Sequence, residues 1–324
     1  MATAADSPSD RALKALRVSE SRYRRLFETA RDGILLLNSD TAQIEDVNPY
    51  LIELLGYSHA EFLGKKLWEV GPFADRAESK EMFAELQAKG YVRYEDLPLK
   101  TKAGAEIPVE FVSNTYDCEG IRIIQCNIRN ITERKQMEDR VRQMAFFDEL
   151  TKLPNRRLLG DRLSQAMAAC KRTGCHAVMM VLDLDDFKLV NDAHGHAVGD
   201  LLLIETAHRL KSCVREVDTV ARFGGDEFVV MIGDLDADPA ESRSQAEAVT
   251  RKIRAALAMP YVLELQHEGT AESTIEHHCT ASIGVALFGK HEASQANILK
   301  WADTAMYRAK EAGCNLIRFY DSTA

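Results

Sequence analysis

The sequence predicts an α+β protein built from two domains that a helix joins. At 324 residues the chain has room for two domains of ordinary size, and its 46% hydrophobic and 28% charged residues are typical of globular proteins. The first half carries short strand-like runs separated by turn signals, and the second half alternates strands with helical segments. A charge-rich segment with helical spacing separates the two halves and indicates a helical connection.

An N-terminal helix, assigned to residues 1–20, is predicted to lead into the first domain because residues 11–30 alternate apolar and charged positions at helical spacing. Its inner stripe is expected to consist of Leu13, Leu16, Tyr23, Leu26 and Phe27. The opening residues carry acids where a signal peptide needs a basic start, and no apolar run approaches the roughly 18 residues of a membrane helix. We therefore expect a cytoplasmic protein with no membrane partner.

The first domain contains strand-like runs from Asp32 onward, with turn signals at residues 102–104 and 117–120. The last three runs predict a meander, and short helical segments in the middle complete an α+β domain. With NPYLIELLGYSHAEFLGKKLWEV in the middle and RNITERK at the close, this layout resembles a PAS sensor domain over residues 17–134.

The resemblance does not identify a ligand for this domain. The segment lacks the cysteine-containing GxNCRFLQ block of photoactive flavin relatives, and its only histidine, His59, lies in a polar loop. Haem bound through histidine and covalent flavin chemistry are therefore disfavoured. A small ligand, a noncovalent flavin and a purely dimerising role stay open, so the PAS ligand is unknown.

A helical linker is predicted over residues 131–147. Met137, Val141 and Met144 are spaced by four and three, which is the spacing of a short coiled-coil seam. This pattern favours a helix that joins the domains across the axis of a homodimer. The alternative is a single amphipathic helix packed on its own domain.

The second half begins where Pro154 breaks the chain and Asn155 can cap the helix that follows. The continuous apolar run 178–182 predicts a strand buried on both faces. Asp183 and Asp185 follow it two apart, and therefore on one face, as an acidic patch. This patch would meet a second acidic turn if the two strands are neighbours, and otherwise it is an acid pair that faces water at the sheet edge.

The second acidic turn lies in RFGGDEF, residues 222–228, between strand-like segments. Gly224 and Gly225 supply the positive φ angles that a tight hairpin turn needs. Asp226 and Glu227 repel each other unless a cation lies beside them, and hard carboxylate oxygens suit magnesium. The alternative is a solvated turn without a ligand.

Charge and cysteine content exclude several classes of protein. The formal net charge of −9 disfavours a broad electrostatic grip on nucleic acid, although a local basic pocket can still hold a phosphate. The seven cysteines are odd in number and form no CxxC, so neither a disulfide framework nor a zinc site is predicted. We expect reduced cysteines that mostly serve packing.

Several motifs agree in order and spacing over residues 145–322. LDLDDFKLVNDAHGHAVGD precedes RFGGDEF, while DELTKLPNRR stands at the entry and TASIGVA and WADTAMYRAKEAGCN follow. This segment resembles the GGDEF family, the diguanylate cyclases. The resemblance implies a fold related to class III nucleotide cyclases and polymerase palms. It also implies an enzyme that joins two GTP molecules into cyclic di-GMP, releases two pyrophosphates, and acts as a dimer because each domain binds one GTP.

The resemblance further implies a magnesium or manganese site. Its ligands would be Asp183, Asp226, the backbone carbonyl of Leu184 and, near a second ion, Glu227. Asp226 is the favoured proton acceptor for the attacking 3′-hydroxyl. A metal-bound carboxylate is a weak base, so Glu227 or a water molecule stays open for that role.

Substrate contacts also follow from the resemblance. Asn191 and Asp200 correspond to guanine readers, and their amide and carboxylate match the edge of guanine better than that of adenine. His196 lies at another substrate-contacting position, with a structural role as the alternative. The groups expected to hold the β- and γ-phosphates are Lys188, Lys310 and the backbone N–H groups of Asp186 and Phe187.

Two further features bear on regulation and activity. Arg215 and Asp218 form an RxxD at the place of the family's product-inhibition site, although a plain i, i+3 pair is the alternative. Cys314 stands where the family often has the Arg of KxxGRN, so weaker GTP binding or slower turnover is expected. A non-catalytic effector that binds GTP or cyclic di-GMP and acts through dimerisation is the alternative function, and a PAS-mediated scaffold is the third.

Overall fold

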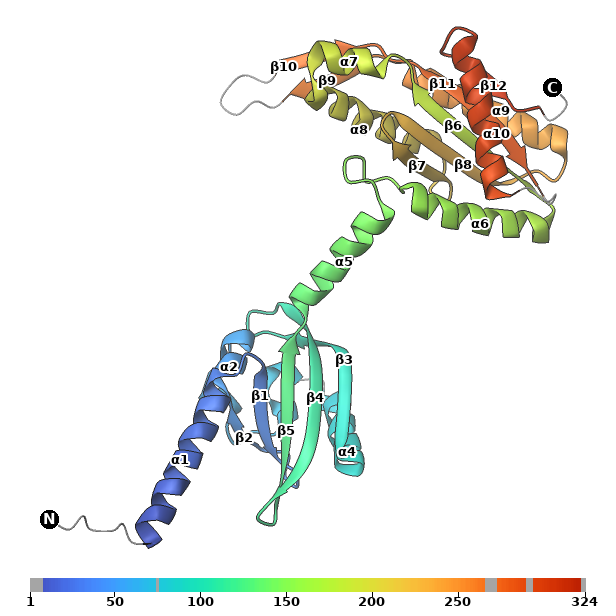
Figure 1. The fold of residues 1–324 in the computed structure, drawn as a ribbon. Helices are drawn as coiled ribbons and strands as arrows, with labels where there is room; N and C mark the ends of the chain where they lie inside the picture. The colour runs from blue at the N-terminus through green and yellow to red at the C-terminus, as the bar shows by residue number, and fades with distance from the viewer. Residues whose placement is uncertain (1–7, 74–75, 266–272, 290–293, 322–324) are drawn as a thin grey trace. The chain divides into compact units, whose positions relative to one another are not determined.

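The computed structural model of the chain describes residues 8–73, 76–265, 273–289 and 294–321. The chain divides into two compact units, Met1–Asp139 and Arg140–Ala324, which we call the N-terminal and C-terminal units (Figure 1). None of the described helices is both long enough and apolar enough to cross a membrane.

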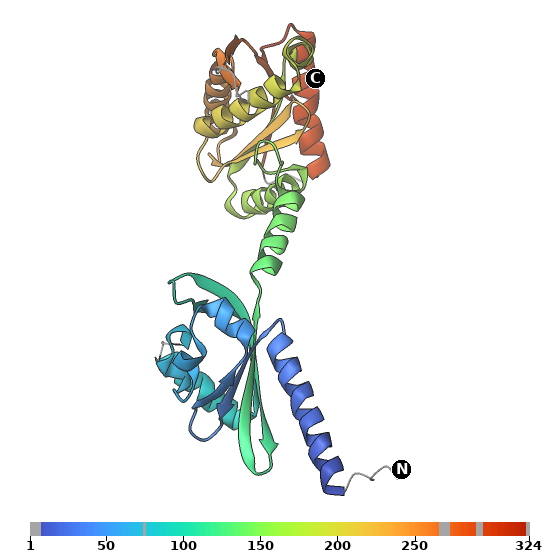
Figure 2. The ribbon, with the colours of Figure 1, turned by 90° about the vertical axis from the view of Figure 1, so that its left-hand side faces the viewer.

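The N-terminal unit is an antiparallel five-stranded sheet of order β2-β1-β5-β4-β3, covered by short helices (Figure 2). Its elements and the helix that follows them are α1 (Pro8–Thr29), β1 (Gly33–Asn38), β2 (Ile44–Val47), α2 (Pro49–Leu55), α3 (His59–Phe62), the 3₁₀ helices η1 (Leu67–Glu69) and η2 (Gly71–Phe73), α4 (Arg76–Lys89), β3 (Tyr91–Lys100), β4 (Glu106–Cys118), β5 (Ile121–Asn130) and α5 (Thr132–Phe146). The predicted three-strand meander is confirmed as β3-β4-β5, with left-handed glycines at both of its turns.

Helix α1 is present, but its predicted inner stripe is wrong for four of five side chains. Phe27 is buried, whereas Leu13, Leu16, Tyr23 and Leu26 are all at least half exposed. The reason is that α1 meets the body of the unit through its C-terminal end, where the Phe27 carbonyl accepts a hydrogen bond from Asn48.

Asn48 ties three elements of this unit together. Its Oδ1 accepts hydrogen bonds from Ile34 N (2.9 Å) and Leu51 N (3.1 Å), and its Nδ2 donates to the carbonyls of Asp32 (2.9 Å) and Phe27 (3.2 Å). The side chain is fully buried and all of its hydrogen-bonding capacity on these atoms is used. It therefore caps α2 while it fixes α1 and β1.

Replacing Asn48 by alanine is expected to lower the free energy of unfolding of the N-terminal unit by about 2 to 3 kcal/mol, because buried donors and acceptors lose their partners. Urea unfolding in a Trp301→Phe background measures this, since Trp68 then reports on this unit alone. Asn114→Ala, on β4, is the control, with a change of about 0.5 kcal/mol or less. Equal losses of unfolding free energy in the two variants would contradict the stabilising role assigned to Asn48.

Helix α5 contains no buried residue among those described. Met137, Val141 and Met144 are 67%, 64% and 63% exposed. Within one chain, therefore, these side chains do not pack on the helix's own domain, and that alternative is wrong. The coiled-coil seam between two chains of a dimer stays a prediction.

The C-terminal unit is a five-stranded sheet of order β12-β11-β6-β8-β7 with helices on both faces and a separate β9-β10 hairpin (Figure 1). Its elements are α6 (Arg156–Thr173), β6 (His176–Leu184), α7 (Phe187–His194), α8 (His196–Cys213), β7 (Thr219–Gly224), β8 (Glu227–Leu235), α9 (Pro239–Leu257), β9 (Tyr261–Leu265), β10 (Ser273–His277), β11 (Ala281–Phe288), α10 (Gln295–Glu311) and β12 (Ile317–Phe319).

Strand β6 is the centre of this sheet, and the prediction of a strand buried on both faces is confirmed. Val178 and Leu182 pack in the core beneath α8 and α9, whereas Met179 and Val181 pack against α6 and α10. The two-residue period places Asp183 on the α10 side. The predicted cap is also confirmed, because the Asn155 side chain accepts from the first N–H groups of α6.

Candidate active site

The RFGGDEF segment forms the predicted hairpin. Strand β7 ends at Gly224 and β8 begins at Glu227, with φ angles of 149° at Gly224 and 54° at Gly225. Both angles favour glycine. Arg222 holds the turn from the side, since its Nη2 and Nε donate to the Gly225 carbonyl at 2.6 and 3.0 Å.

The end of β6 lies directly beside this turn. Strands β6 and β8 pair antiparallel, with Asp183 opposite Glu227, and Leu184 N donates to the Asp226 carbonyl at 3.4 Å. Acids from two segments that are far apart in the sequence are thereby brought to one edge of the sheet, as the sequence predicts for neighbouring strands.

Asp183 is the buried acid of this group. Lys310 Nζ, from α10, lies 2.5 Å from Asp183 Oδ1. The ammonium contacts this buried oxygen directly, as an ion pair and a hydrogen bond, while a carboxylate has further acceptor positions on its two oxygens. Lys310 therefore neutralises charge without saturating the carboxylate.

The site as a whole carries surplus negative charge. Burial raises the pKa of Asp183, and Asp226 and Glu227 raise it further, against the opposing influence of Lys310. Burial lowers the pKa of Lys310, but Asp183, together with Asp226 and Asp185, raises it above its ordinary value overall. Burial is thus the main reason that the pKa of Asp183 is raised, whereas the neighbouring carboxylates are the reason that the pKa of Lys310 is raised.

These residues fit a hard divalent cation. The donor set consists of carboxylate oxygens, which suit magnesium or manganese, and the buried Asp183 carboxylate has acceptor positions beyond its contact with Lys310. Within the described ranges, no three His, Cys, Asp or Glu side chains are gathered closely enough to bind a metal by themselves. An ion at Asp183 has to compete with Lys310, and it needs further oxygen ligands from substrate phosphates or water.

Asp185 belongs to a different structure from Asp183. Its carboxylate accepts hydrogen bonds from Thr280 Oγ1 (2.6 Å), Ser282 Oγ (2.7 Å) and Asn315 N (2.9 Å). The alternative of an acid pair facing water is wrong, because both acids are buried. Asp185 fastens the end of β6 to β11 and to the loop after α10.

The expected substrate-binding residues lie at the start of α7, on α7 and in the first turns of α8, apart from Lys310, which lies on α10. Asn191 is half-buried, and a side-chain carbon at Gly199 would lie 2.0 Å from its Oδ1, so glycine at 199 leaves the Asn191 amide in its present position. His196, Asp200 and Lys188 are exposed. Before α7 the chain turns through Asp186, which has a φ of 57°, and Phe187 then begins the helix, whose first N–H groups lack acceptors within it.

Comparison with known protein families shows which families the two halves of the chain match. Residues 145–316 match the family described as diguanylate cyclase, GGDEF domain, and residues 31–133 match the PAS domain family. The chain belongs to the GGDEF family. Both resemblances seen in the sequence are confirmed, and the N-terminal unit carries a PAS domain.

Similar proteins include signalling proteins and diguanylate cyclases. An uncharacterised signalling protein of Caulobacter vibrioides is 35% identical over 305 residues, which cover 92% of this chain and 35% of that protein. The bifunctional diguanylate cyclase/cyclic di-GMP phosphodiesterase MucR of Pseudomonas aeruginosa is 42% identical over 56% of this chain and 24% of MucR. Diguanylate cyclase DgcM of Escherichia coli is 28% identical over 96% of this chain and 73% of DgcM. The chain thus spans about a third or less of the first two of these relatives.

Two solved structures extend the comparison. The GGDEF domain of TpbB (YfiN) from Pseudomonas aeruginosa is 35% identical and covers 54% of this chain and 94% of that chain, with a TM-score of 0.48. The coiled coil and GGDEF domain of DgcB from Caulobacter crescentus, in complex with c-di-GMP, is 27% identical. It covers 58% of this chain and 93% of that chain, with a TM-score of 0.49.

The RxxD of the GGDEF domain forms a local pair. Arg215 N donates to Asp218 Oδ2 at 2.9 Å, and Arg215 Nε lies 3.6 Å from the same oxygen. Asp218 is buried, whereas the Arg215 side chain is 64% exposed. The i, i+3 pair is present, and it leaves most of the guanidinium accessible.

Cys314 lies in a tight loop after α10, with φ angles of 59° at Cys314 and 48° at Asn315. Burial, and then the charge of Asp185, raises the pKa of the Cys314 thiol. A raised pKa means little thiolate at neutral pH and low reactivity. This favours the packing interpretation of Cys314 over redox regulation.

Sequence reasoning missed an ion pair between the entry of the GGDEF domain and its hairpin. Arg222 Nη1 donates to both Asp148 oxygens, at 3.0 and 3.2 Å, while the same guanidinium holds the Gly225 carbonyl. Burial alone would raise the pKa of Asp148, but hydrogen bonds from Thr151 and Arg222 outweigh it and the pKa is lowered. The sequence does show an acid at Asp148, the first residue of the DELT segment. No neighbouring residue indicates that Arg222 is its partner.

Replacing Arg222 by alanine is expected to destabilise the GGDEF domain by about 1 to 3 kcal/mol near pH 7, because a mostly buried charge pair and a turn contact are lost. Since the folded pKa of Asp148 is depressed, its contribution is present above the unfolded pKa of about 4 and is lost as pH falls through the folded value. Urea unfolding at pH 7 and pH 3 measures both effects. Arg308→Ala, an exposed position on α10, is the control, and equal losses at both pH values contradict the account.

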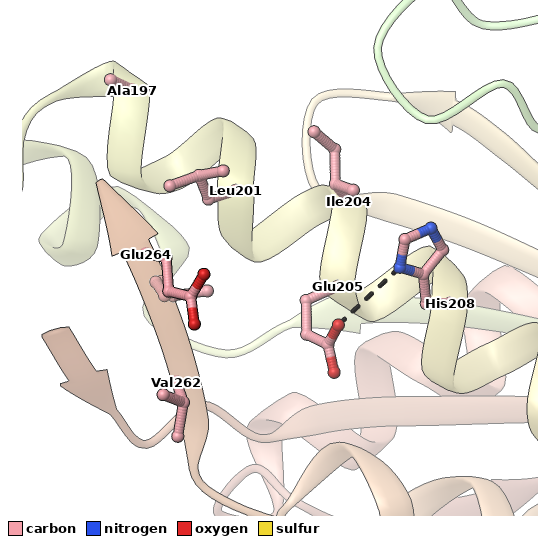
Figure 3. Close-up of a pocket in the computed structure, with 8 residues that line it drawn as sticks. Ala197, Leu201, Ile204, Glu205, His208, Val262 and Glu264 are labelled. Atoms are coloured by element: carbon pink, nitrogen blue, oxygen red, sulfur yellow. Dashed lines mark ion pairs between the residues drawn. The ribbon is translucent and has the colours of Figure 1, made fainter. Parts of the chain in front are cut away.

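A hollow of about 520 Å³ lies between α8 and β9 (Figure 3). Leu201, Ile204 and Val262 line it together with Glu205 and His208, which lie 3.8 Å apart. None of the site residues predicted from the sequence lines this hollow. It therefore takes no part in the candidate active site.

Proposed function

We propose that this chain is a diguanylate cyclase that converts two GTP molecules into cyclic di-GMP and two pyrophosphates with the help of magnesium or manganese. The observation that carries the proposal is the juxtaposition of Asp183 on β6 with the Asp226-Glu227 turn. The surplus negative charge at this edge favours a cation. Membership of the GGDEF family supports the same conclusion.

The proposed metal ligands are Asp183 and the Leu184 carbonyl at the end of β6, together with Asp226 and Glu227 at the hairpin turn. A bound divalent ion supplies charge neutralisation for the triphosphate and a lower pKa for the 3′-hydroxyl. Asp226 lies at the turn, half-exposed, where it can accept the hydroxyl proton. Glu227 stands opposite Asp183 in the strand register and completes the acidic edge.

Guanine recognition is assigned to Asn191 and Asp200 and phosphate binding to Lys188 and Lys310. The carboxylate of Asp200 can accept from the ring N–H and amino group of guanine, whereas adenine would present an acceptor there. Such a mismatch leaves polar groups unpaired and favours GTP over ATP. The first backbone N–H groups of α7, at Phe187, and the preceding turn at Asp186 point to anion binding, and His196 is a further substrate contact.

The proposed enzyme works as a homodimer, because ring closure needs two GTP molecules held face to face by two domains. The exposed apolar residues of α5 provide a seam for this association. We assign to the PAS domain the control of dimer geometry.

Purified chain incubated with GTP and MgCl₂, with the products separated by ion-exchange chromatography and mass spectrometry, tests the proposal. We expect cyclic di-GMP and pyrophosphate in a 1:2 ratio, and a rate per chain that rises with protein concentration. No product at any concentration rejects the enzyme. That result then favours a non-catalytic effector that binds GTP or cyclic di-GMP and acts through dimerisation. Cys314 in place of arginine is the specific observation in favour of this alternative.

Product inhibition is proposed at Arg215 and Asp218. Replacing Arg215 by alanine is expected to weaken cyclic di-GMP binding by about tenfold or more and to relieve inhibition, since a bidentate contact with guanine or phosphate is lost. Calorimetric titration and the initial rate at rising product concentration measure the two effects. Lys211→Ala, in the last turn of α8, is the control; undiminished inhibition in Arg215→Ala rejects the assignment.

A further inference from the structure

The turn that carries Asp226 has little of its own to hold it in place. Gly224 and Gly225 have no side chains and have φ angles of 149° and 54°, so this backbone has access to many other conformations. Asp226 and Glu227 follow directly, and their charges repel each other until a cation binds. A turn of this composition needs a contact from elsewhere in the fold to keep Asp226 in one position.

Arg222 supplies this contact at the peptide bond before Asp226. Its Nη2 and Nε both donate to the carbonyl oxygen of Gly225, at 2.6 and 3.0 Å. Because the atoms of a peptide unit lie in one plane, holding this oxygen with two donors restricts the positions of the nitrogen and the α-carbon of Asp226. The guanidinium of Arg222 therefore limits the movement of Asp226 relative to the sheet.

Asp148 in turn holds the guanidinium. Both of its oxygens accept from Nη1 of Arg222, at 3.0 and 3.2 Å, and its Oδ1 also accepts from N and Oγ1 of Thr151, at 2.8 and 2.6 Å. The side chains of Arg222 and Asp148 are 11% and 22% exposed, so water competes little for these bonds. Because a guanidinium is rigid and planar, an acid that fixes one of its nitrogens also fixes the direction of the other two.

The loop between α5 and α6 joins these contacts to the end of α5. Nδ2 of Asn155 donates to the Ala145 carbonyl at 3.0 Å, and the Asn155 N–H donates to the Phe146 carbonyl at 2.9 Å. The Pro154 carbonyl accepts from the Arg222 N–H at 3.0 Å. Hydrogen bonds thus connect the last turn of α5, this loop and the strand that leads into the acidic turn.

We propose that Asp148 is a positioning residue for the cyclase reaction. It orients Arg222, which holds the Gly225 carbonyl, and we call this arrangement the Asp148–Arg222 clamp. The clamp keeps Asp226 beside Asp183, where both carboxylates can contact one divalent ion. This catalytic consequence rests on the proposed function, whereas the ordering of the turn by the clamp does not.

Amide hydrogen exchange of residues 222–228 in the purified full chain, without nucleotide or metal, tests the clamp. Arg222→Lys keeps the positive charge but lacks the planar fork that contacts Asp148 and Gly225 together. Asp148→Asn keeps one oxygen for Thr151 and removes the carboxylate charge. We expect exchange to be faster by about tenfold in Arg222→Lys, as for one lost hydrogen bond to a charged group, and by a smaller factor in Asp148→Asn. Unchanged exchange in both variants overturns the clamp.

Arg209→Lys is the matched control for this experiment. The Arg209 side chain is similarly buried, at 16% exposure, and donates to the carbonyls of Met259 (2.6 Å) and Pro260 (2.7 Å), which follow α9. We expect exchange of residues 222–228 in Arg209→Lys to match the original chain. Equal acceleration in Arg209→Lys and Arg222→Lys would reflect a general loss of stability and would overturn the clamp.

Mn²⁺ affinity with a non-hydrolysable GTP analogue, and the kinetics with GTP, test the catalytic consequence. We expect Arg222→Lys to lose about tenfold in Mn²⁺ affinity and in kcat, because residues that orient metal ligands typically account for about 10- to 100-fold. The KM for GTP is expected to stay within about twofold, since the proposed guanine contacts on α7 and α8 are unchanged. Faster exchange with undiminished Mn²⁺ affinity and kcat overturns the positioning role. If the original chain forms no cyclic di-GMP, the proposed function fails, and the exchange and Mn²⁺ results still decide the clamp.

Discussion

Replacing Asp226 by asparagine is expected to lower the rate of cyclic di-GMP formation by more than about 100-fold. Groups that merely orient metal ligands already account for about 10- to 100-fold, and this substitution removes a proposed ligand and the proton acceptor together. The isosteric amide keeps the turn, because the Leu184 N–H binds the backbone carbonyl of residue 226 and not its side chain. The rate with saturating GTP and MgCl₂ measures the effect.

Asp234→Asn provides the matched control. Asp234 is exposed near the far end of β8 and has a φ of 52°, a conformation that asparagine adopts readily. Its rate is expected to stay within about twofold of the original. A comparable loss of rate in both variants would mean that the effect comes from removing any negative charge of the domain, and not from changing the acidic edge.

Replacing Asp185 by asparagine is expected to destabilise the C-terminal unit by about 3 to 5 kcal/mol. Thr280, Ser282 and the Asn315 N–H all donate to this buried carboxylate, so an amide places its own donors against one of them. Urea unfolding in a Trp68→Phe background, where Trp301 reports on this unit alone, measures the loss.

Asp186→Asn is the control for this stability prediction. Asp186 is exposed, makes no side-chain cap bond to α7 and has a φ of 57°, which asparagine tolerates. We expect its unfolding free energy to change by about 0.5 kcal/mol or less. If Asp185→Asn is as stable as Asp186→Asn, the carboxylate does not fasten β6 to β11.

The features that the sequence predicts well are those set by local chemistry. Two consecutive glycines specify the hairpin before Asp226, and an uninterrupted apolar run specifies β6. Asn155 caps α6 because an amide oxygen can accept from the first N–H groups of any helix that follows it. Each of these needs only neighbours in the chain.

The features that the sequence does not predict depend on partners far along the chain. Asp185 resembles Asp183 in its local pattern, and only the arrival of β11 and the loop after α10 makes it a structural anchor. The ion pair between Arg222 and Asp148 likewise forms only because the fold brings these two distant residues together. The stripe of α1 is wrong for a related reason, because helical periodicity shows which side chains share a face and not whether the chain covers that face.

The central claim is that Asp183 and Asp226 bind one divalent ion together. Electron paramagnetic resonance of free Mn²⁺, titrated into the chain with a non-hydrolysable GTP analogue, counts the bound ions directly. We predict tight Mn²⁺ binding in the original chain and in Asp234→Asn, and a loss of at least tenfold in affinity in Asp226→Asn. Undiminished Mn²⁺ binding by Asp226→Asn would contradict the account.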